Sequence, residues 1–137
     1  LTVFSFLGSA IIKAPAADAG AFPYAIVLID GAQNVVFRGF SVSGPLPDTL
    51  FCSVDLRTGI SVMGGGSATI RNNVITQIRS ASPSLRGCQN GFGIAVGDSF
   101  FGQTGSAVIT GNVIETYQKG GIFVDGGGEI NGPMIAV

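Results

Sequence analysis

The stretch GSATI at residues 66–70 has two close copies elsewhere in this chain of 137 residues. Residues 8–12 read GSAII, and residues 105–109 read GSAVI. Each copy combines a glycine, which suits a tight turn, with a small residue and an isoleucine at strand-like spacing. A pattern that returns at such separated places predicts a structural repeat, in which every copy occupies the same corner.

A second pattern, Gly-Ile-x-Val, occurs between and after these copies. Its isoleucines are Ile60, Ile94 and Ile122, and a looser copy at 27–31 places Val27 at the same position. The four positions are separated by 33, 34 and 28 residues. A period near 30 residues that contains only strand-sized pieces is typical of a solenoid, in which each repeat forms one coil.

Residues within each piece alternate between the predicted interior and exterior. Ile60 and Val62 point inward and Ser61 and Met63 outward, which is the alternation of a β-strand. Coils of short strands stacked about 4.8 Å apart form parallel sheets around one continuous core. We therefore predict an all-β fold, a right-handed parallel β-helix solenoid of about four to five coils with three short strands per coil. The predicted core comprises Ile29, Phe37, Ile60, Val62, Ile70, Ile75, Ile94, Val96, Ile109, Ile114, Ile122 and Val124.

A third segment closes each unit, and its fourth residue is Phe40, Asn73 or Asn112. Asparagine tolerates a left-handed backbone, and stacked asparagine side chains can bond amide to amide along a solenoid axis. We predict an asparagine ladder between Asn73 and Asn112. The alternative is that one of these amides is a ligand or a catalytic donor.

Three longer stretches resemble a known family. They are NVVFRGFSVSG at 34–44, SATIRNNVITQI at 67–78 and GSAVITGNVIETYQKGGIFVDG at 105–126. They look like coils of the right-handed parallel β-helix of the pectin-lyase-like superfamily, and are most similar to bacterial β-helix-repeat proteins of mostly unknown function. The resemblance covers residues 25–128 and implies a secreted protein. It leaves the activity open, because that superfamily includes lyases, hydrolases, epimerases, adhesins and scaffolds.

We expect residues 1–137 to form a single β-helix domain. The chain begins in strand-like residues without an initiator methionine or a signal peptide, and it ends in strand-like residues. We therefore expect it to be a fragment or processed piece of a longer solenoid. Open ends would expose strand edges and core side chains, which favours self-association.

The composition excludes several classes of function. The net charge is −1 and the seven lysines and arginines are scattered, whereas nucleic-acid binding needs a clustered basic surface. No apolar run approaches the roughly 18 residues of a membrane span. Histidine is absent, which removes histidine-based catalysis and histidine-ligated zinc. No cofactor is expected, apart from the calcium considered below.

The two cysteines, Cys52 and Cys88, fall in excursions at 44–58 and 77–90. These loops occupy the same corner of neighbouring predicted coils, so we predict a Cys52–Cys88 disulfide and an oxidising, extracellular location. The alternative is a pair of free buried thiols in a cytosolic protein.

The predicted ligand site lies on one sheet face and an inserted loop at 97–105. Outward positions of neighbouring coils carry carboxylates there, and the loop carries two adjacent aromatic residues that could stack on sugar rings. A calcium ion could bind between Asp98 and Asp125. The alternatives are that the aspartates serve turns and that the aromatics form a hydrophobic lid on the solenoid wall. The candidate residues are Asp98, Phe100, Phe101, Tyr117, Lys119, Phe123 and Asp125.

These features favour a secreted scaffold or binding module that displays loops and recognises a polysaccharide. One alternative is a fragment of a polysaccharide lyase, hydrolase or epimerase, and another is a structural or self-associating surface protein. The sequence departs from the patterns of such enzymes, because it has no Asp-Asp pair, no Asp-x-Asp and no histidine. Fold analogy alone supports the enzyme.

Overall fold

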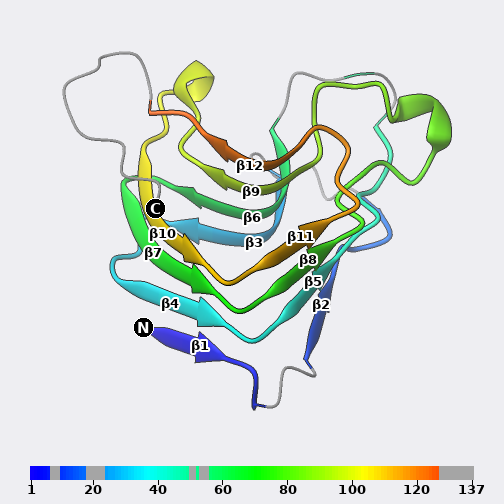
Figure 1. Ribbon diagram of the computed structural model, residues 1–137. Helices are drawn as coiled ribbons and strands as arrows, with labels where there is room; N and C mark the ends of the chain where they lie inside the picture. The colour runs from blue at the N-terminus through cyan, green and yellow to red at the C-terminus, as the bar shows by residue number, and fades with distance from the viewer. Residues whose placement is uncertain (7–9, 18–23, 50–51, 53–55, 127–137) are drawn as a thin grey trace.

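The chain folds into a stack of short parallel strands, seen in a computed structural model that describes residues 1–6, 10–17, 24–49, 52 and 56–126 (Figure 1). The strands form three parallel sheets of four strands each. Sheet A contains β1 (Thr2–Phe4), β4 (Val35–Arg38), β7 (Gly66–Arg71) and β10 (Gly105–Thr110). Sheet B contains β2 (Ile11–Lys13), β5 (Ser41–Ser43), β8 (Val74–Thr76) and β11 (Val113–Glu115). Sheet C contains β3 (Tyr24–Asp30), β6 (Arg57–Met63), β9 (Phe92–Val96) and β12 (Gly120–Val124).

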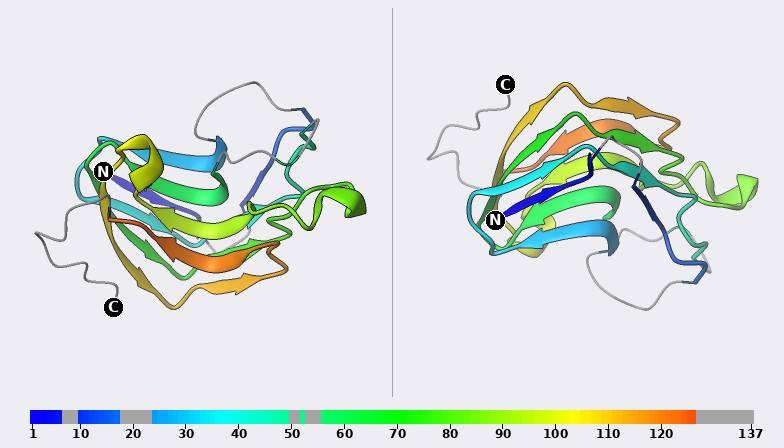
Figure 2. Two further views of the ribbon diagram at one scale, coloured as in Figure 1. Left: turned by 90° about the horizontal axis from the view of Figure 1, so that it is seen from above. Right: turned by 90° about the horizontal axis from the view of Figure 1, so that it is seen from below.

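Each turn of the chain adds one strand to every sheet, so the twelve strands make four coils of three. The register follows the repeat, because Val27 pairs with Ile60, Ile60 with Ile94, and Ile94 with Ile122. Figure 2 shows the stack from above and from below. The coil that contains β1 lies at one end of the stack and the coil that contains β12 at the other. The predicted parallel β-helix of three-stranded coils is therefore confirmed, with four coils in the described residues.

The three GSAxI stretches do not share one corner. Gly66 pairs with Gly105 and Ile70 with Ile109 in sheet A, as the repeat predicts. Ile11 and Ile12 of the stretch at 8–12 instead lie in β2 of sheet B, where Ile12 pairs with Val42. The prediction for this third copy is wrong, because a five-residue match cannot distinguish a turn into sheet A from a turn into sheet B.

The predicted core residues point into the interior. The most completely buried side chains come from the middle coils, including Ile60, Ile70 and Ile75, each with no exposed surface. Ile109, Ile114 and Val124 of the last coil are partly buried against this cluster. Ile122 is half exposed, because β12 is the last strand of its sheet in the described residues.

The outer face of sheet C is covered where the alternation predicts solvent. Met63 and Ala95 point away from the main core, yet both are buried and form a second cluster with Leu56. Ser61 has no exposed surface, and every residue of β6 is buried. These side chains do point outward, as the alternation predicts, but they are buried, because a strand's alternation says nothing about what folds over its outer face.

Gly59 and Gly93 of the Gly-Ile-x-Val repeat are needed because their positions face side chains of sheet B. A Cβ atom at Gly59 would lie 3.0 Å from Ile75 Cγ2 and 2.7 Å from the Gly93 carbonyl oxygen. A Cβ atom at Gly93 would meet Ile114 Cγ2 and would lie 2.6 Å from the Gly121 carbonyl oxygen. Sheet C can therefore pack against sheet B only if these positions carry no side chain.

Replacing Gly93 with alanine is expected to lower the free energy of unfolding by about 1–3 kcal/mol, because backbone as well as side chain must move. Gly87→Ala is the matched control, since a Cβ atom there would have no neighbour within 4 Å. Chemical unfolding of both variants measures the difference. Equal stability of the two variants would contradict this account of the repeat.

An asparagine ladder links three coils at the corner between sheets A and B. Asn73 Nδ2 donates a hydrogen bond to Asn112 Oδ1 (2.9 Å) and another to the Phe37 carbonyl oxygen (3.2 Å). Asn73 Oδ1 accepts from the Phe40 backbone N–H (3.0 Å), and Asn112 Oδ1 accepts from the Asn73 backbone N–H (3.0 Å). The left-handed backbone lies one residue earlier than expected, at Asn72. Asn73, whose side chain bonds along the solenoid axis, and Asn72, whose left-handed backbone turns the chain, are thus adjacent in sequence.

The predicted disulfide is confirmed. Cys52 and Cys88, which are 36 positions apart in sequence, are bonded, with their Cα atoms 5.2 Å apart. The bond joins loops of neighbouring coils and fits an oxidising compartment. The described part of the chain contains no helix with the length and apolar surface that crossing a lipid bilayer would take.

Candidate functional site

A short loop between β9 and β10 carries the exposed aromatic residues of the predicted site. It contains one 3-10 turn, η3 (Ser99–Phe101), and it is closed by two backbone hydrogen bonds. The Asp98 N–H donates to the Gln103 carbonyl oxygen, and the Gln103 N–H donates to the Asp98 carbonyl oxygen, both at 2.8 Å. Gly102 ends the turn at φ 65°, a left-handed conformation that glycine adopts without strain. The backbone of the loop is therefore fixed by hydrogen bonds between the residues that come directly before and after the turn.

Phe100 and Phe101 extend from this turn. Phe100 is 77% exposed and Phe101 is 36% exposed. Their ring centroids lie 4.8 Å apart at an interplanar angle of 76°, which is an edge-to-face pair. The two rings support each other, and most of the surface of the Phe100 ring remains in water.

Asp125 anchors the turn to the end of β12. Its Oδ2 atom accepts hydrogen bonds from the Ser99 backbone N–H (3.0 Å) and from Ser99 Oγ (2.6 Å). Ser99 and Asp125 come from neighbouring coils, so this contact fixes the loop against the solenoid.

Asp98 is buried beside the same turn. Burial raises the pKa of the Asp98 carboxyl above its ordinary value, and the nearby Asp125 charge acts in the same direction. Hydrogen bonds from the Phe101 and Phe100 backbone N–H groups lower the pKa in part. Both aspartates therefore bond to the turn that carries the aromatic pair. Within the described residues, no three side chains of the types that hold a metal ion gather in one place, here or elsewhere.

Phe123 lies on the outer face of β12 and packs against Phe92. The two ring centroids are 4.8 Å apart and the rings are tilted by 35°. Both rings join the second cluster on the outer face of sheet C, and both are only partly buried. Phe123 thus continues the aromatic surface along sheet C from the η3 loop.

Tyr117 and Lys119 do not lie at the η3 loop. They precede β12, whereas Asp125 follows it, so the five residues of the strand separate the two groups (Figure 1). At about 3.3 Å per residue, the six steps from Lys119 to Asp125 span roughly 20 Å. The Tyr117 ring contacts Gly121, where a Cβ atom would lie 3.3 Å from Tyr117 Cε1. The structure therefore brings Asp98, Phe100, Phe101 and Asp125 together, and places Tyr117 and Lys119 at the other end of the sheet.

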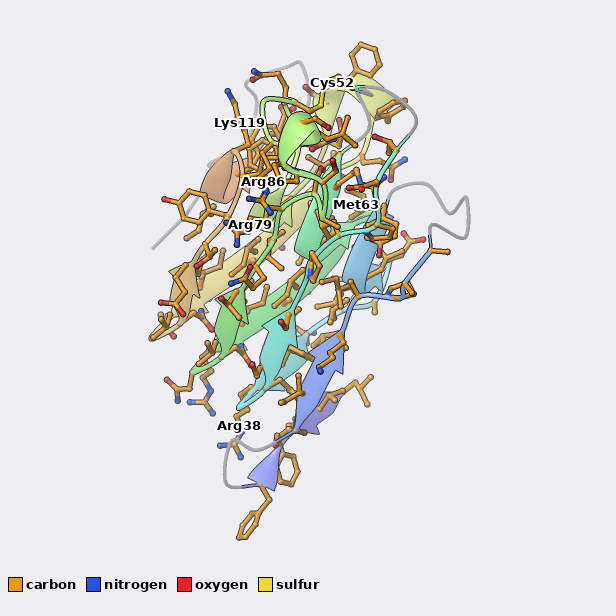
Figure 3. The ribbon with its side chains drawn as sticks, turned by 90° about the vertical axis from the view of Figure 1, so that its right-hand side faces the viewer. Arg38, Cys52, Met63, Arg79, Arg86 and Lys119 are labelled. Carbon is orange, nitrogen blue, oxygen red and sulfur yellow. A yellow bond between two sulfur atoms is a disulfide. The ribbon has the colours of Figure 1, made fainter. Side chains whose placement is uncertain are left out.

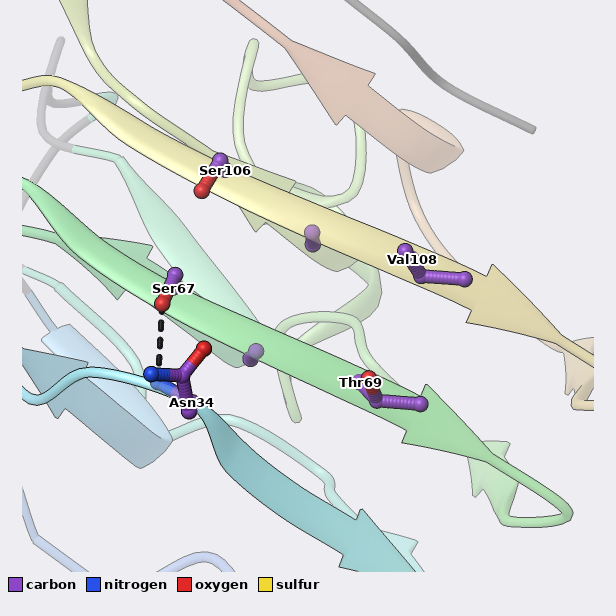
Figure 4. A pocket seen from close by; sticks show the side chains of 7 residues that line it. Asn34, Ser67, Thr69, Ser106 and Val108 are labelled. Carbon is purple, nitrogen blue, oxygen red and sulfur yellow. Dashed lines mark hydrogen bonds between the residues drawn. The ribbon is translucent and has the colours of Figure 1, made fainter.

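A shallow groove of about 390 Å³ lies on the outer face of sheet A, over β7 and β10 (Figure 4). Ser67 Oγ lies at its edge, where it accepts from the Asn34 N–H (2.8 Å) and bonds Gln33 Oε1 (3.0 Å). The only sign of this groove in the sequence is the serine that recurs in GSAxI. The lining side chains are small and neutral, so they provide neither charge nor an aromatic ring for orienting a ligand. The lining residues are Asn34, Ser67, Ala68, Thr69, Ser106, Ala107 and Val108.

Gln118 organises the corner at the amino end of β12. Its Nε2 atom donates to the carbonyl oxygens of Leu85 (3.0 Å) and Cys88 (3.1 Å), and its Oε1 atom accepts from the Ser80 N–H (2.9 Å). This side chain thus ties the disulfide-bonded loop to the next coil. Nothing in the sequence pattern indicates this role, because the bonded residues are 30 or more positions away.

No protein-family model, no curated protein and no solved structure matches this chain. Its chemistry is therefore argued from its own residues. The feature best suited to bind a ligand is the η3 loop, which combines exposed aromatic rings with a backbone fixed by hydrogen bonds.

Proposed function

We propose that this protein is a secreted β-solenoid binding module that recognises a polysaccharide through the η3 loop. The observation that carries the proposal is the Phe100–Phe101 pair, two solvent-facing rings on a turn that is bonded at Asp98, Gln103 and Asp125. Aromatic rings provide flat apolar surfaces with few rotatable bonds, so stacking a sugar ring on them costs little conformational entropy.

The solenoid supplies rigidity to this surface. Because Ser99 is bonded to Asp125 of the next coil, the backbone that carries the rings does not have to be ordered when a ligand binds. The partly exposed Phe92 and Phe123 extend the aromatic surface over sheet C toward the other end of β12. A chain of sugar units laid along sheet C would contact both groups of rings.

A pectin-lyase-like ancestry and a secreted location belong to this proposal. The disulfide supports secretion, since such bonds persist in oxidising compartments. The parallel β-helix supports the ancestry at the level of fold only.

Phe100→Ala is expected to weaken polysaccharide binding by about 1–2 kcal/mol, roughly five- to thirtyfold in Kd, through lost stacking and burial. An array of soluble neutral polysaccharides identifies a ligand, and titration calorimetry compares the variants. Phe6→Ala is the matched control, because Phe6 is 79% exposed against 77% for Phe100. Equal affinity of wild type and Phe100→Ala would rule out the η3 loop as the binding surface.

The same samples test the enzymatic alternative. A reducing-sugar assay and an assay for unsaturated products measure turnover of each polysaccharide. Turnover that Asp125→Asn abolishes, while binding is kept, would replace the binding module with a catalytic role for Asp98 and Asp125.

A further inference from the structure

We propose a second binding surface, for the anionic groups of a polysaccharide, at the corner between sheets B and C. It is formed by Arg79, Arg86 and Lys119, which we name the basic corner (Figure 3). The choice of a polysaccharide rests on the proposed function, but the surface is separate from the η3 loop. Lys119 precedes β12, whereas the η3 loop meets the residue that follows it.

Neighbouring coils bring Arg79 and Lys119 to the same corner. The Gln118 N–H donates to the Ile78 carbonyl oxygen at 3.0 Å, and Arg79 and Lys119 are the residues that follow these two. The Lys119 N–H in turn donates to the Gly91 carbonyl oxygen at 3.1 Å. The backbone that carries both cations is therefore hydrogen-bonded between coils.

The loop that contains Arg86 folds back on itself, so that Arg86 lies at the same corner as Arg79. Its Nε atom donates to the Ser80 carbonyl oxygen (3.3 Å) and Nη2 to the Ala81 carbonyl oxygen (3.2 Å). The Gln118 side chain, described above, bonds both Ser80 and the loop that contains Arg86. Arg79 is held as well, since its Nε atom donates to Gln77 Oε1 at 3.1 Å. Two of the three cations are thus oriented before any ligand binds.

Among the residues that the structure describes, the cations of the basic corner form no ion pair. Three of the seven lysines and arginines of the chain lie here, in a protein whose net charge is −1. Arg79 and Arg86 bond only neutral oxygens in the described residues. Of the carboxylates in the described part of the chain, those on neighbouring segments are Asp48, which accepts a hydrogen bond from the Ser82 N–H, and the exposed Glu115 of β11. The corner therefore presents more positive than negative charge to solvent.

The chemistry of these side chains favours an anionic polysaccharide. Guanidinium groups pair with carboxylate or sulfate through parallel hydrogen bonds, and arginine is weakly hydrated, so the pairing costs little desolvation. Tyr117, two residues before Lys119, is 45% exposed and adds an aromatic ring to the same segment. A polymer with repeated charges can use several cations at once. Sulfate esters and carboxylates both supply that chemistry.

Dextran, dextran sulfate and carboxymethyl dextran test the proposal, because the three share one sugar backbone. Each is titrated into wild type, into R79Q/R86Q/K119Q, and into the control K13Q/R38Q/R71Q. The control removes the same number of charges from exposed residues outside the basic corner. Arg38 and Arg71 end β4 and β7 of sheet A, and Lys13 ends β2, three coils away from Lys119. R79Q/R86Q/K119Q, the corner variant, is expected to bind at least one of the two charged dextrans about tenfold more weakly than wild type does. The affinity of the control variant for the same polymer should change less than twofold.

The charged polymer that shows this loss identifies the anionic group, sulfate or carboxylate. Binding to it is expected to weaken as salt is raised, because salt screens surface charge. Absence of binding to both charged polymers, equal losses in the two triple variants, or an unchanged corner variant would each overturn the proposal.

Two further variants distinguish binding at the basic corner from a loss of protein stability and from binding at the η3 loop. Lys119→Gln alone changes an exposed side chain and is expected to weaken binding two- to threefold without altering the thermal unfolding temperature. Phe100→Ala should leave binding of the charged dextran unchanged, since the η3 loop lies at the other end of β12. A loss in Phe100→Ala equal to that of the corner variant would place both ligands at the η3 loop and overturn the basic corner.

Discussion

Asn73→Ala is expected to lower the free energy of unfolding by about 3–4 kcal/mol. Asn73 is 1% exposed, and its side chain satisfies the Phe40 N–H and the Phe37 carbonyl oxygen. Alanine would leave both backbone groups buried without these partners, and each unsatisfied group costs about 1–3 kcal/mol. Urea unfolding followed by circular dichroism measures the change.

Asn112→Ala is the matched control for this prediction. Asn112 belongs to the last coil and is only partly buried, so water can replace some of its hydrogen bonds. We expect a loss of about half the size. Asn73→Asp adds a second test, because an ionised aspartate has no donor for the Phe37 and Asn112 oxygens and should destabilise at neutral pH. Asn73→Ala and Asn112→Ala variants of equal stability would contradict the ladder as a source of stability.

Removing the disulfide is expected to lower the free energy of unfolding by about 3–4 kcal/mol. Cys52 and Cys88 are 36 positions apart, and in the chain-entropy model closing a loop of this length restricts the unfolded chain by that amount. The double variant Cys52→Ser/Cys88→Ser and the reduced wild type should unfold at the same denaturant concentration. We expect both to fold at room temperature, since Gln118 still bonds the Cys88 loop to the next coil.

The control for this prediction is reductant added to the double serine variant, which should have no effect. Wild-type protein that is equally stable with and without reductant would show that the bond adds nothing to the fold. Free thiols in oxidised wild-type protein, detected by alkylation and mass spectrometry, would contradict the bond itself.

The coil register could be predicted from the sequence because it depends on a local property. Alternation of apolar and polar residues indicates which side chains face the core, and a period near 30 residues aligns Ile60 with Ile94 and Ile122. The Asn73–Asn112 contact and the Cys52–Cys88 bond follow from that register, since equivalent positions of neighbouring coils lie next to each other. The same reasoning was wrong for residues 8–12, where the match was too short to identify the sheet.

The surfaces were decided only by the tertiary structure. Alternation places Met63 and Ala95 outside the main core, but contacts with Leu56 bury them. Tyr117 and Lys119 are close in sequence to Phe123, yet an extended strand carries them away from the η3 loop. The basic corner depends on Gln118, which bonds residues 30 or more positions away. The sequence by itself therefore determined the coils and their core, because these repeat locally, whereas the path of each loop depends on contacts between distant residues that have no period.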